Sequence, residues 1–166
     1  MAEAVSWEPT EMTGTLAAAS FSLALGRMGP RMLEGRPGKV FVAPLDVLFS
    51  DRNVLQPDVM FVTEERLPRI EKNFVRSAPD IVIEVSSPSR RRLELVRKRE
   101  LYERFGVPEF WYVDLEDDRV EVYRIGGDRY AAPGIIDRSG SLDSPHLPGF
   151  SLSVDELLGP PERDAS

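Results

Sequence analysis

The sequence contains no cysteine and only one histidine among its 166 residues. Without cysteine the chain can form neither a disulfide framework nor a thiolate metal site, and this composition is consistent with a reducing compartment. We therefore expect a cytoplasmic protein. The one histidine, His146, has neither a cysteine nor a second histidine to act with it. The composition thus argues against a zinc site and against a catalytic triad that uses histidine.

Long apolar runs are also missing. The longest weakly polar stretch, residues 16–25, is too short to cross a bilayer, and no basic region precedes it. We expect neither a membrane helix nor a signal peptide, and no membrane partner. The Gly126-Gly127 pair indicates a turn rather than a phosphate-binding loop, because no Walker or dinucleotide-binding signature surrounds it.

The net charge of −7 argues against a protein that coats nucleic acid non-specifically, but the charge is unevenly distributed along the chain. Residues 89–104 carry seven basic and three acidic side chains, a local charge of +4, whereas residues 109–166 carry five basic and thirteen acidic side chains, a local charge of −8. A concentrated basic patch on an acidic body can still meet a phosphate backbone. The alternative is that the basic run at Arg90, Arg91 and Arg92 is only a solvated helix start.

The length and the apolar pattern predict one domain of the α+β class, with a mixed sheet and helices packed on it. We expect a loose lead-in over residues 1–15, a single domain over residues 16–158 and a frayed tail over residues 159–166. Turn residues predict hairpins around residues 50–53 and 126–128. The expected strands cover residues 40–42, 45–49, 59–62, 80–86, 110–113 and 120–124, and the expected helical segments cover residues 16–33, 91–105 and 154–158. Residues 64–77 are expected to form a loop that can include a helical turn.

The stretch from residue 78 to residue 114 organises this prediction. An apolar strand, a helix and a second apolar strand follow one another here, as in a βαβ crossover, so the two strands are expected to be parallel. Glu84 stands in the first of these strands, among apolar residues. Burying an ionised carboxylate costs free energy unless a partner or a metal compensates. The alternative is a carboxylate near a strand end that pairs with an arginine.

Helical spacing places Lys98 on the same stripe as Leu95, Leu101 and Tyr102, which should face the sheet. A lysine on an apolar stripe must extend its ammonium group to the surface or meet a carboxylate. The alternative is an ordinary pair between Lys98 and Glu94 along the helix. That alternative explains the pair but not its place on the apolar stripe.

Asp58 follows Pro57 at the start of another apolar strand, and by itself it indicates an aspartate that bonds the local backbone after a turn. Together, Asp58 and Glu84 can supply two carboxylates from neighbouring strand ends to a hard divalent cation such as Mg²⁺, with the carbonyl of Val85 as a further ligand. Lys98 can then position or deprotonate an attacking water and offset charge on a phosphate. These groups suit phosphodiester hydrolysis.

A recognisable pattern runs through five segments: Gln56-Pro57-Asp58, Ala78-Pro79-Asp80, Glu84-Val85-Ser86-Ser87-Pro88-Ser89, Lys98-Arg99-Glu100-Leu101-Tyr102 and Gly106-Val107-Pro108-Glu109-Phe110-Trp111. The pattern resembles the bacterial family of Uma-two-type "putative restriction endonucleases", which belongs to the PD-(D/E)xK nuclease superfamily. The resemblance extends over about residues 40–158. It implies a restriction-endonuclease-like fold, with a mixed β-sheet flanked by helices, and a Mg²⁺-dependent endonuclease that hydrolyses DNA and accepts Mn²⁺ as a substitute.

Carried over residue by residue, the resemblance implies that Asp58 and Glu84 are the acidic metal ligands and that Lys98 is the catalytic lysine. Ser86 stands where the usual E-x-K pattern has a lysine. The resemblance therefore implies that the following helix supplies this lysine, as Lys98. The expected phosphate contacts are Arg90, Arg91 and Arg92.

Relatives usually carry a Glu-Leu-Ile-Asp-Gly-type motif before their first long helix, and residues 1–15 do not show it. Three hypotheses follow. The first is an active endonuclease with DNA as its partner, as a monomer or as a homodimer. The second is a catalytically degenerate family member that acts as a binding or assembly module. The third is a structural domain in which Asp58, Glu84 and Lys98 lie apart in surface ion pairs.

Overall fold

The computed structural model describes residues 16–17, 19–21, 23–24, 38–43, 45–71, 74–86 and 92–161. The strands in this part of the chain are β1 (Gly38–Val42), β2 (Asp46–Ser50), β3 (Asn53–Leu55), β4 (Val59–Thr63), β5 (Ile70–Glu71), β6 (Phe74–Val75), β7 (Ile81–Val85), β8 (Glu109–Asp114), β9 (Arg119–Gly126), β10 (Arg129–Tyr130), β11 (Gly134–Asp137), β12 (Ser141–Leu142) and β13 (Leu152–Ser153). The helices are the 3₁₀ helix η1 (Glu64–Arg69), α3 (Arg92–Arg104) and α4 (Val154–Leu158), and the described residues of the range 16–24 are also helical. The predicted lead-in and residues 25–33 of the first predicted helix lie outside the described residues.

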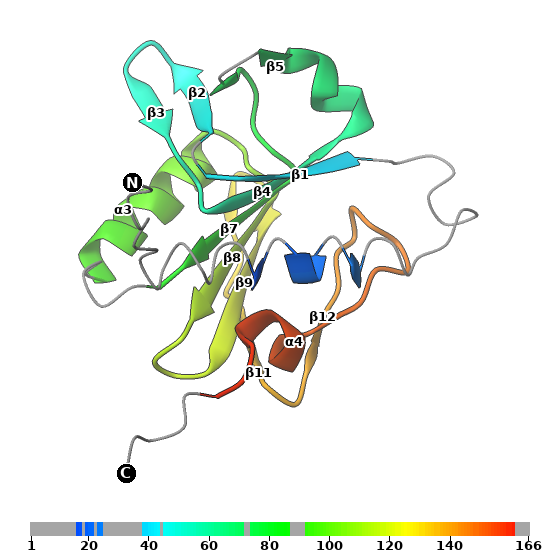
Figure 1. Ribbon diagram of the computed structural model, residues 1–166. Coiled ribbons are helices and arrows are strands. Elements are labelled where there is room, and N and C mark those ends of the chain that lie inside the picture. The colour runs from blue at the N-terminus through cyan, green and yellow to red at the C-terminus, as the bar shows by residue number, and fades with distance from the viewer. Residues whose placement is uncertain are drawn as a thin grey trace, which may run out of the picture.

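A seven-stranded mixed sheet forms the centre of the fold (Figure 1). Its order is β1-β4-β7-β8-β9-β10, and β11 pairs with β9 as well. β7 and β8 are parallel, whereas the other pairings in this sheet are antiparallel. The parallel pair is joined by α3, so the predicted βαβ crossover is confirmed, as is the α+β class.

Both predicted hairpins are confirmed. β2 and β3 are antiparallel, with Leu48 opposite Val54. β9 and β10 are antiparallel, with Gly126 opposite Arg129, and the turn between them places Gly127 at a φ of 80°. Glycine adopts this left-handed conformation without the steric penalty that a β-carbon brings, which is why the Gly126-Gly127 pair indicates a turn.

The prediction for residues 64–77 is wrong in part. The helical turn it allowed is present as η1, but the stretch also contains the strands β5 and β6, which join β2 and β3 in a second sheet of order β3-β2-β6-β5. The strands β11, β12 and β13 were also not expected. The strands β5, β6, β12 and β13 have two residues each, too few to show an alternating pattern, so only their tertiary pairing reveals them. Within the described residues, no helix is long and apolar enough to cross a membrane.

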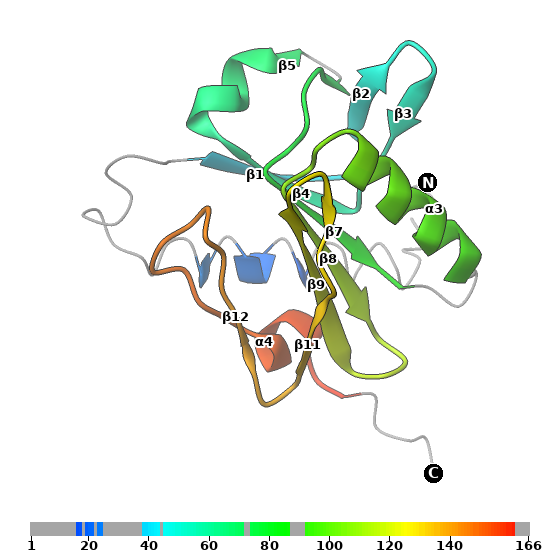
Figure 2. The ribbon, with the colours of Figure 1, turned by 180° about the vertical axis from the view of Figure 1, so that it is seen from behind.

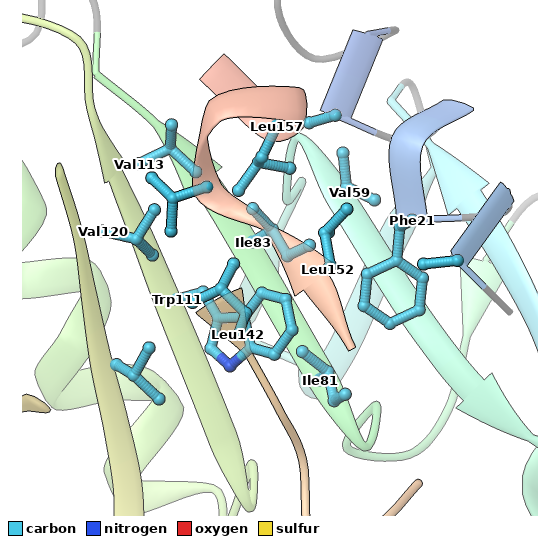
Figure 3. Packing of buried hydrophobic residues seen from close by; sticks show 14 of the residues in the cluster. Phe21, Val59, Ile81, Ile83, Trp111, Val113, Val120, Leu142, Leu152 and Leu157 are labelled. Carbon is cyan, nitrogen blue, oxygen red and sulfur yellow. The ribbon is translucent and has the colours of Figure 1, made fainter. Parts of the chain in front are cut away.

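The two faces of the central sheet are covered by different helices. α3 lies on one face, and α4 lies with the helical residues near Phe21 on the other, as the two opposite views show (Figures 1 and 2). Side chains of β7 alternate between these faces: Ile81 and Ile83 belong to the core under α4, whereas Val82 belongs to the core under α3. Figure 3 shows Ile81 and Ile83 packed with Phe21 and Trp111 on the α4 side.

A fully buried acid, Glu109, begins β8 on the α4 side of the sheet. Its oxygens accept hydrogen bonds from Trp111 Nε1 (2.8 Å), Arg124 Nε (3.1 Å) and Ser144 Oγ (2.6 Å). Arg124 also donates to the carbonyl and the carboxylate of Asp143. This cluster joins β8 and β9 to the segment that follows β12, so the carboxylate is both buried and well supplied with donors.

We expect Glu109→Gln to lower the free energy of unfolding by about 1–3 kcal/mol, because an amide NH₂ group would face one of the buried donors. The measurement is urea unfolding, in which the midpoint should fall while the slope stays unchanged. Asp143→Asn is the matched control. Asp143 bonds the same arginine, but its side chain is 81% exposed, so we expect a change of no more than about 1 kcal/mol. Equal effects of the two substitutions would contradict the proposed difference in burial.

Candidate active site

Glu84 lies near the end of β7, on the sheet face that α3 covers. Its neighbours Ile83 and Val85 belong to the opposite core, so strand alternation directs Glu84 toward the helix. In the parallel pairing with β8, Glu84 stands opposite Tyr112. The residue is only 2% exposed. The burial expected from the apolar neighbours in the sequence is therefore present in the structure. The carboxylate of Glu84 needs partners that offset the free-energy cost of burying its charge.

Two side chains of α3 supply that compensation. Lys98 Nζ lies 3.1 Å from both Oε1 and Oε2 of Glu84, and the hydroxyl of Tyr102 donates to Oε1 at 2.6 Å. Lys98 and Tyr102 are four residues apart and so share one face of the helix. Lys98 thus bonds to Glu84 on the sheet, while Glu94, its partner in the alternative interpretation, has an exposed side chain.

The turn that ends α3 determines where Lys98 and Tyr102 lie along the sheet. Gly106 has a φ of 74°, its N–H donates to the carbonyl of Glu103, and the N–H of Val107 donates to the carbonyl of Tyr102. These bonds form a Schellman motif, in which glycine ends the helix without a steric penalty. Val107 is buried in the same core as Tyr102. The motif therefore ties the last turn of α3 to the sheet that carries Glu84.

Asp58 precedes β4 and is bound to the neighbouring strand. Its Oδ2 accepts a hydrogen bond from the backbone N–H of Val85 at 2.8 Å. In the antiparallel pairing of β4 with β7, Val59 stands opposite Ile83, so Asp58 and Glu84 are the next residues along the two strands. Asp58 is 8% exposed. The backbone bond of Asp58 therefore crosses to another strand, unlike the local bond of the alternative.

Burial raises the pKa of Glu84 from its ordinary value of 4.5 to about 7. The opposite charge of Lys98 lowers this pKa, the like charge of Asp58 raises it, and the hydrogen bonds from Tyr102 and Lys98 lower it. Burial, followed by the charge of Glu84, holds the pKa of Tyr102 well above its ordinary value of 10.0. Tyr102 therefore remains a hydrogen-bond donor, and the effect of Asp58 on Glu84 places two carboxylates within electrostatic reach.

The structure brings Asp58, Glu84 and Lys98 to one buried place, as the first two hypotheses require and the third does not. Their roles as ligands and catalytic lysine stay predictions. Tyr102 was expected only as an apolar stripe residue, although its position four residues after Lys98 already placed it on the same helix face. Of the expected phosphate contacts, Arg90 and Arg91 lie outside the described residues, and Arg92 begins α3 with a side chain that is not described.

The donor set suits a hard divalent cation. Mg²⁺ takes oxygen ligands and is commonly held by one or two carboxylates while it keeps several waters. Asp58 and Glu84 offer two buried carboxylates that repel each other, and a bound cation would relieve this repulsion. In the described part of the chain, no group of three or more acidic, histidine or cysteine side chains could hold a metal ion. The chemistry of the two carboxylates fits Mg²⁺, which would keep waters at its remaining positions.

The fold and the site define an α+β protein of the restriction-endonuclease-like class, in which two acids and a lysine meet on one face of a mixed sheet. A model of the Uma2 family, described as "Putative restriction endonuclease", matches residues 8–155. The chain belongs to this family. The match begins earlier than the sequence motifs, within the predicted lead-in.

A crystal structure of a "putative nuclease belonging to DUF820" from Anabaena variabilis is similar to this chain. The TM-score is 0.72 at 18% sequence identity, and the alignment covers 95% of this chain and 84% of that chain. At this identity the similarity shows the fold alone. No curated protein matches the chain.

We expect Glu84→Gln to flatten the pH dependence of stability when no divalent cation is present. Since the pKa of Glu84 is raised from 4.5 to about 7 in the folded chain, the folded state binds this proton more tightly than the unfolded state. The stabilisation is therefore full below the unfolded pKa and is lost as pH rises through the folded pKa. Wild type should lose up to about 3 kcal/mol from this group between about pH 5 and pH 8.

The measurement is urea unfolding of both proteins across this range in the presence of a chelator, with Glu94→Gln as the control for removing an exposed acid from α3. The Glu94→Gln profile should run parallel to that of wild type. A Glu84→Gln profile that is also parallel to wild type would show that the pKa of Glu84 is not raised.

Proposed function

We propose that this chain is a Mg²⁺-dependent endonuclease that hydrolyses phosphodiester bonds in DNA. The observation that carries the proposal is the buried Glu84 carboxylate, which Lys98 and Tyr102 hold within electrostatic reach of Asp58. Membership of a restriction endonuclease family supports the same reaction class. Fold alone would not be enough, because function depends on the site that a fold carries.

The proposed ligands of the cation are the carboxylates of Asp58 and Glu84 and the carbonyl oxygen of Val85. Mg²⁺ bound there would polarise the scissile phosphate and offset the negative charge that develops on it. Mn²⁺ also prefers oxygen ligands and is the proposed substitute. The remaining tasks, which are to hold the ligands, to orient water and to contact DNA, fall to the protein's own residues.

Lys98 is the proposed catalytic lysine. Its ammonium group lies 3.1 Å from both oxygens of Glu84. A charged lysine can donate a hydrogen bond to a phosphate oxygen and can orient the attacking water. In its neutral form it can take the proton that the attacking water loses and pass it to the oxygen that leaves the phosphorus. The flexible four-carbon stem allows the ammonium group to change partners.

The proposed substrate contacts extend along the basic helix. Arg90, Arg91 and Arg92 are the proposed phosphate contacts at its start, and Arg97 and Arg104 are exposed further along α3. Contacts of this kind fix DNA by its phosphate backbone and carry no base information. A DNA substrate also agrees with the expected cytoplasmic location.

A second candidate is a catalytically degenerate family member that acts as a binding or assembly module. It is favoured by the small number of carboxylates: within the described residues, no cluster reaches three potential metal ligands. In this case the Lys98–Glu84 pair would serve only to satisfy a buried charge. The two candidates differ in whether Asp58 and Glu84 bind a divalent cation.

We expect wild-type protein to nick supercoiled plasmid in the presence of Mg²⁺, and Lys98→Ala to nick it at least about a hundredfold more slowly, which is the usual scale of proton-transfer catalysis. Lys39→Ala is the matched control, because it removes the same charge from an exposed position on β1. It should nick at the wild-type rate. Equal nicking by wild type and Lys98→Ala would remove Lys98 from the mechanism.

Isothermal titration with Mn²⁺ separates the two candidates. We expect wild type to bind one cation, and Asp58→Asn and Glu84→Gln each to weaken binding strongly, because each removes a charged oxygen ligand. The amide variants keep the shape of the side chains and an oxygen that can accept the existing hydrogen bonds. Mn²⁺ binding that is absent, or that is unchanged by both substitutions, would favour the binding module.

A further inference from the structure

Helix α3 gives Glu84 two donors of different kinds. The ammonium group of Lys98 lies 3.1 Å from both carboxylate oxygens, whereas the hydroxyl of Tyr102 binds only Oε1, at 2.6 Å. The metal ligand of the proposed site thus has one charged partner and one neutral partner, both from α3. The neutral partner takes no proton and contacts no phosphate in the proposed mechanism, and its bond is the shorter.

The two partners constrain the carboxylate differently. An ammonium group at equal distances from two oxygens attracts both equally, and its three donors rotate freely about the end of a flexible stem. It therefore does not define which way the carboxylate group turns. A single short hydroxyl bond to Oε1 does define it, because rotation of the carboxylate would break that bond. The orientation of Glu84 is accordingly set by Tyr102.

Tyr102 itself is firmly placed. Its side chain is fully buried. The ring lies 5.4 Å from that of Phe110 on β8 and 6.1 Å from that of Phe49 on β2, between centroids. Its carbonyl accepts the N–H of Val107 in the turn that ends α3. A hydroxyl fixed by packing on both sides can hold a ligand, because its own rotamer is locked.

The two donors, Lys98 and Tyr102, also differ in charge. A divalent cation at Asp58 and Glu84 would repel the ammonium group of Lys98, since like charges in a buried site interact strongly. The hydroxyl of Tyr102 carries no net charge, so a cation would not displace it in this way. Of the two donors, only Tyr102 can hold Glu84 both before and after a cation binds.

We propose that Tyr102 is a positioning residue that holds Glu84 in its cation-binding orientation and leaves Lys98 available to the phosphate and the water. This inference rests on the proposed function, because it assigns a role toward the proposed cation. In this arrangement the packed Tyr102 hydroxyl holds Glu84 in place. The ammonium group of Lys98, four residues away on the same helix face, is the group that moves.

The first test is Mn²⁺ titration of Tyr102→Phe without DNA. The phenyl ring keeps the packing and loses only the hydroxyl, so we expect the dissociation constant to rise by about tenfold to a hundredfold, as when other supporting partners of metal ligands are removed. Tyr123→Phe is the matched control, because its hydroxyl also donates to a glutamate at 2.6 Å, namely Oε2 of Glu121. Tyr123→Phe should bind Mn²⁺ with wild-type affinity.

The second test is the dependence of plasmid nicking on Mn²⁺ concentration. For Tyr102→Phe the concentration that gives half-maximal nicking should rise by the same factor as the dissociation constant. For Lys98→Ala the maximal rate should fall instead. A merely structural role of Tyr102 would lower the amount of active protein and would not move the half-maximal concentration.

The outcomes are distinct. If wild type binds Mn²⁺ and Tyr102→Phe binds it equally well, the positioning role is overturned while the proposed function stands. If wild type binds no Mn²⁺, the proposed function is overturned and the positioning role with it. If Tyr102→Phe does not fold, proton NMR of wild type decides: the Tyr102 hydroxyl resonance should persist when Mg²⁺ is added, and its loss would overturn the role.

Discussion

The burial of one charged group, the carboxylate of Glu84, is the constraint on which the site depends. The strand that carries it is apolar on both sides, so the charge cannot reach water along its own element. α3 supplies the ammonium group of Lys98 and the hydroxyl of Tyr102, both within hydrogen-bond distance of the carboxylate. The compensation is incomplete, because the pKa of Glu84 is raised to about 7 and Asp58 contributes to that rise. Incomplete compensation of this kind is common at functional sites, where local stability is lower than it could be.

A comparison within the same sheet makes this point clearer. Glu109 is buried as deeply as Glu84, but its oxygens accept bonds from an arginine, a tryptophan and a serine. The carboxylate of Asp143 is joined to that cluster through Arg124, and its side chain is exposed. Glu109 joins strands and a following segment, whereas Glu84 faces a second carboxylate. Two buried glutamates of one fold therefore differ in what surrounds them, and this difference separates a structural role from a candidate catalytic one.

The parallel pairing of β7 and β8 explains how the site is assembled. A parallel pair requires a crossover, and α3 is that crossover, so the helix must lie over the strand that carries Glu84. The glycine turn after α3 then determines which helical residues stand above it. The similarity in fold to the DUF820 protein of Anabaena variabilis at 18% identity fits this account, because the topology and the alternation of apolar residues can persist while most side chains change.

The sequence alone was sufficient for the features with a strong local signal: the central βαβ crossover, both hairpins and the α+β class. It also pointed to the meeting of Asp58, Glu84 and Lys98, whose roles stay predictions. Alternation in the strand and helical spacing in α3 are local properties, so they can be read without coordinates. The short strands β5 and β6 and the bond from Tyr102 to Glu84 could not be read in this way. Two-residue strands carry no period, and a tyrosine on an apolar stripe looks like any other core residue. Only the tertiary structure, by bringing the helix onto the strand, decided that its hydroxyl meets a buried carboxylate.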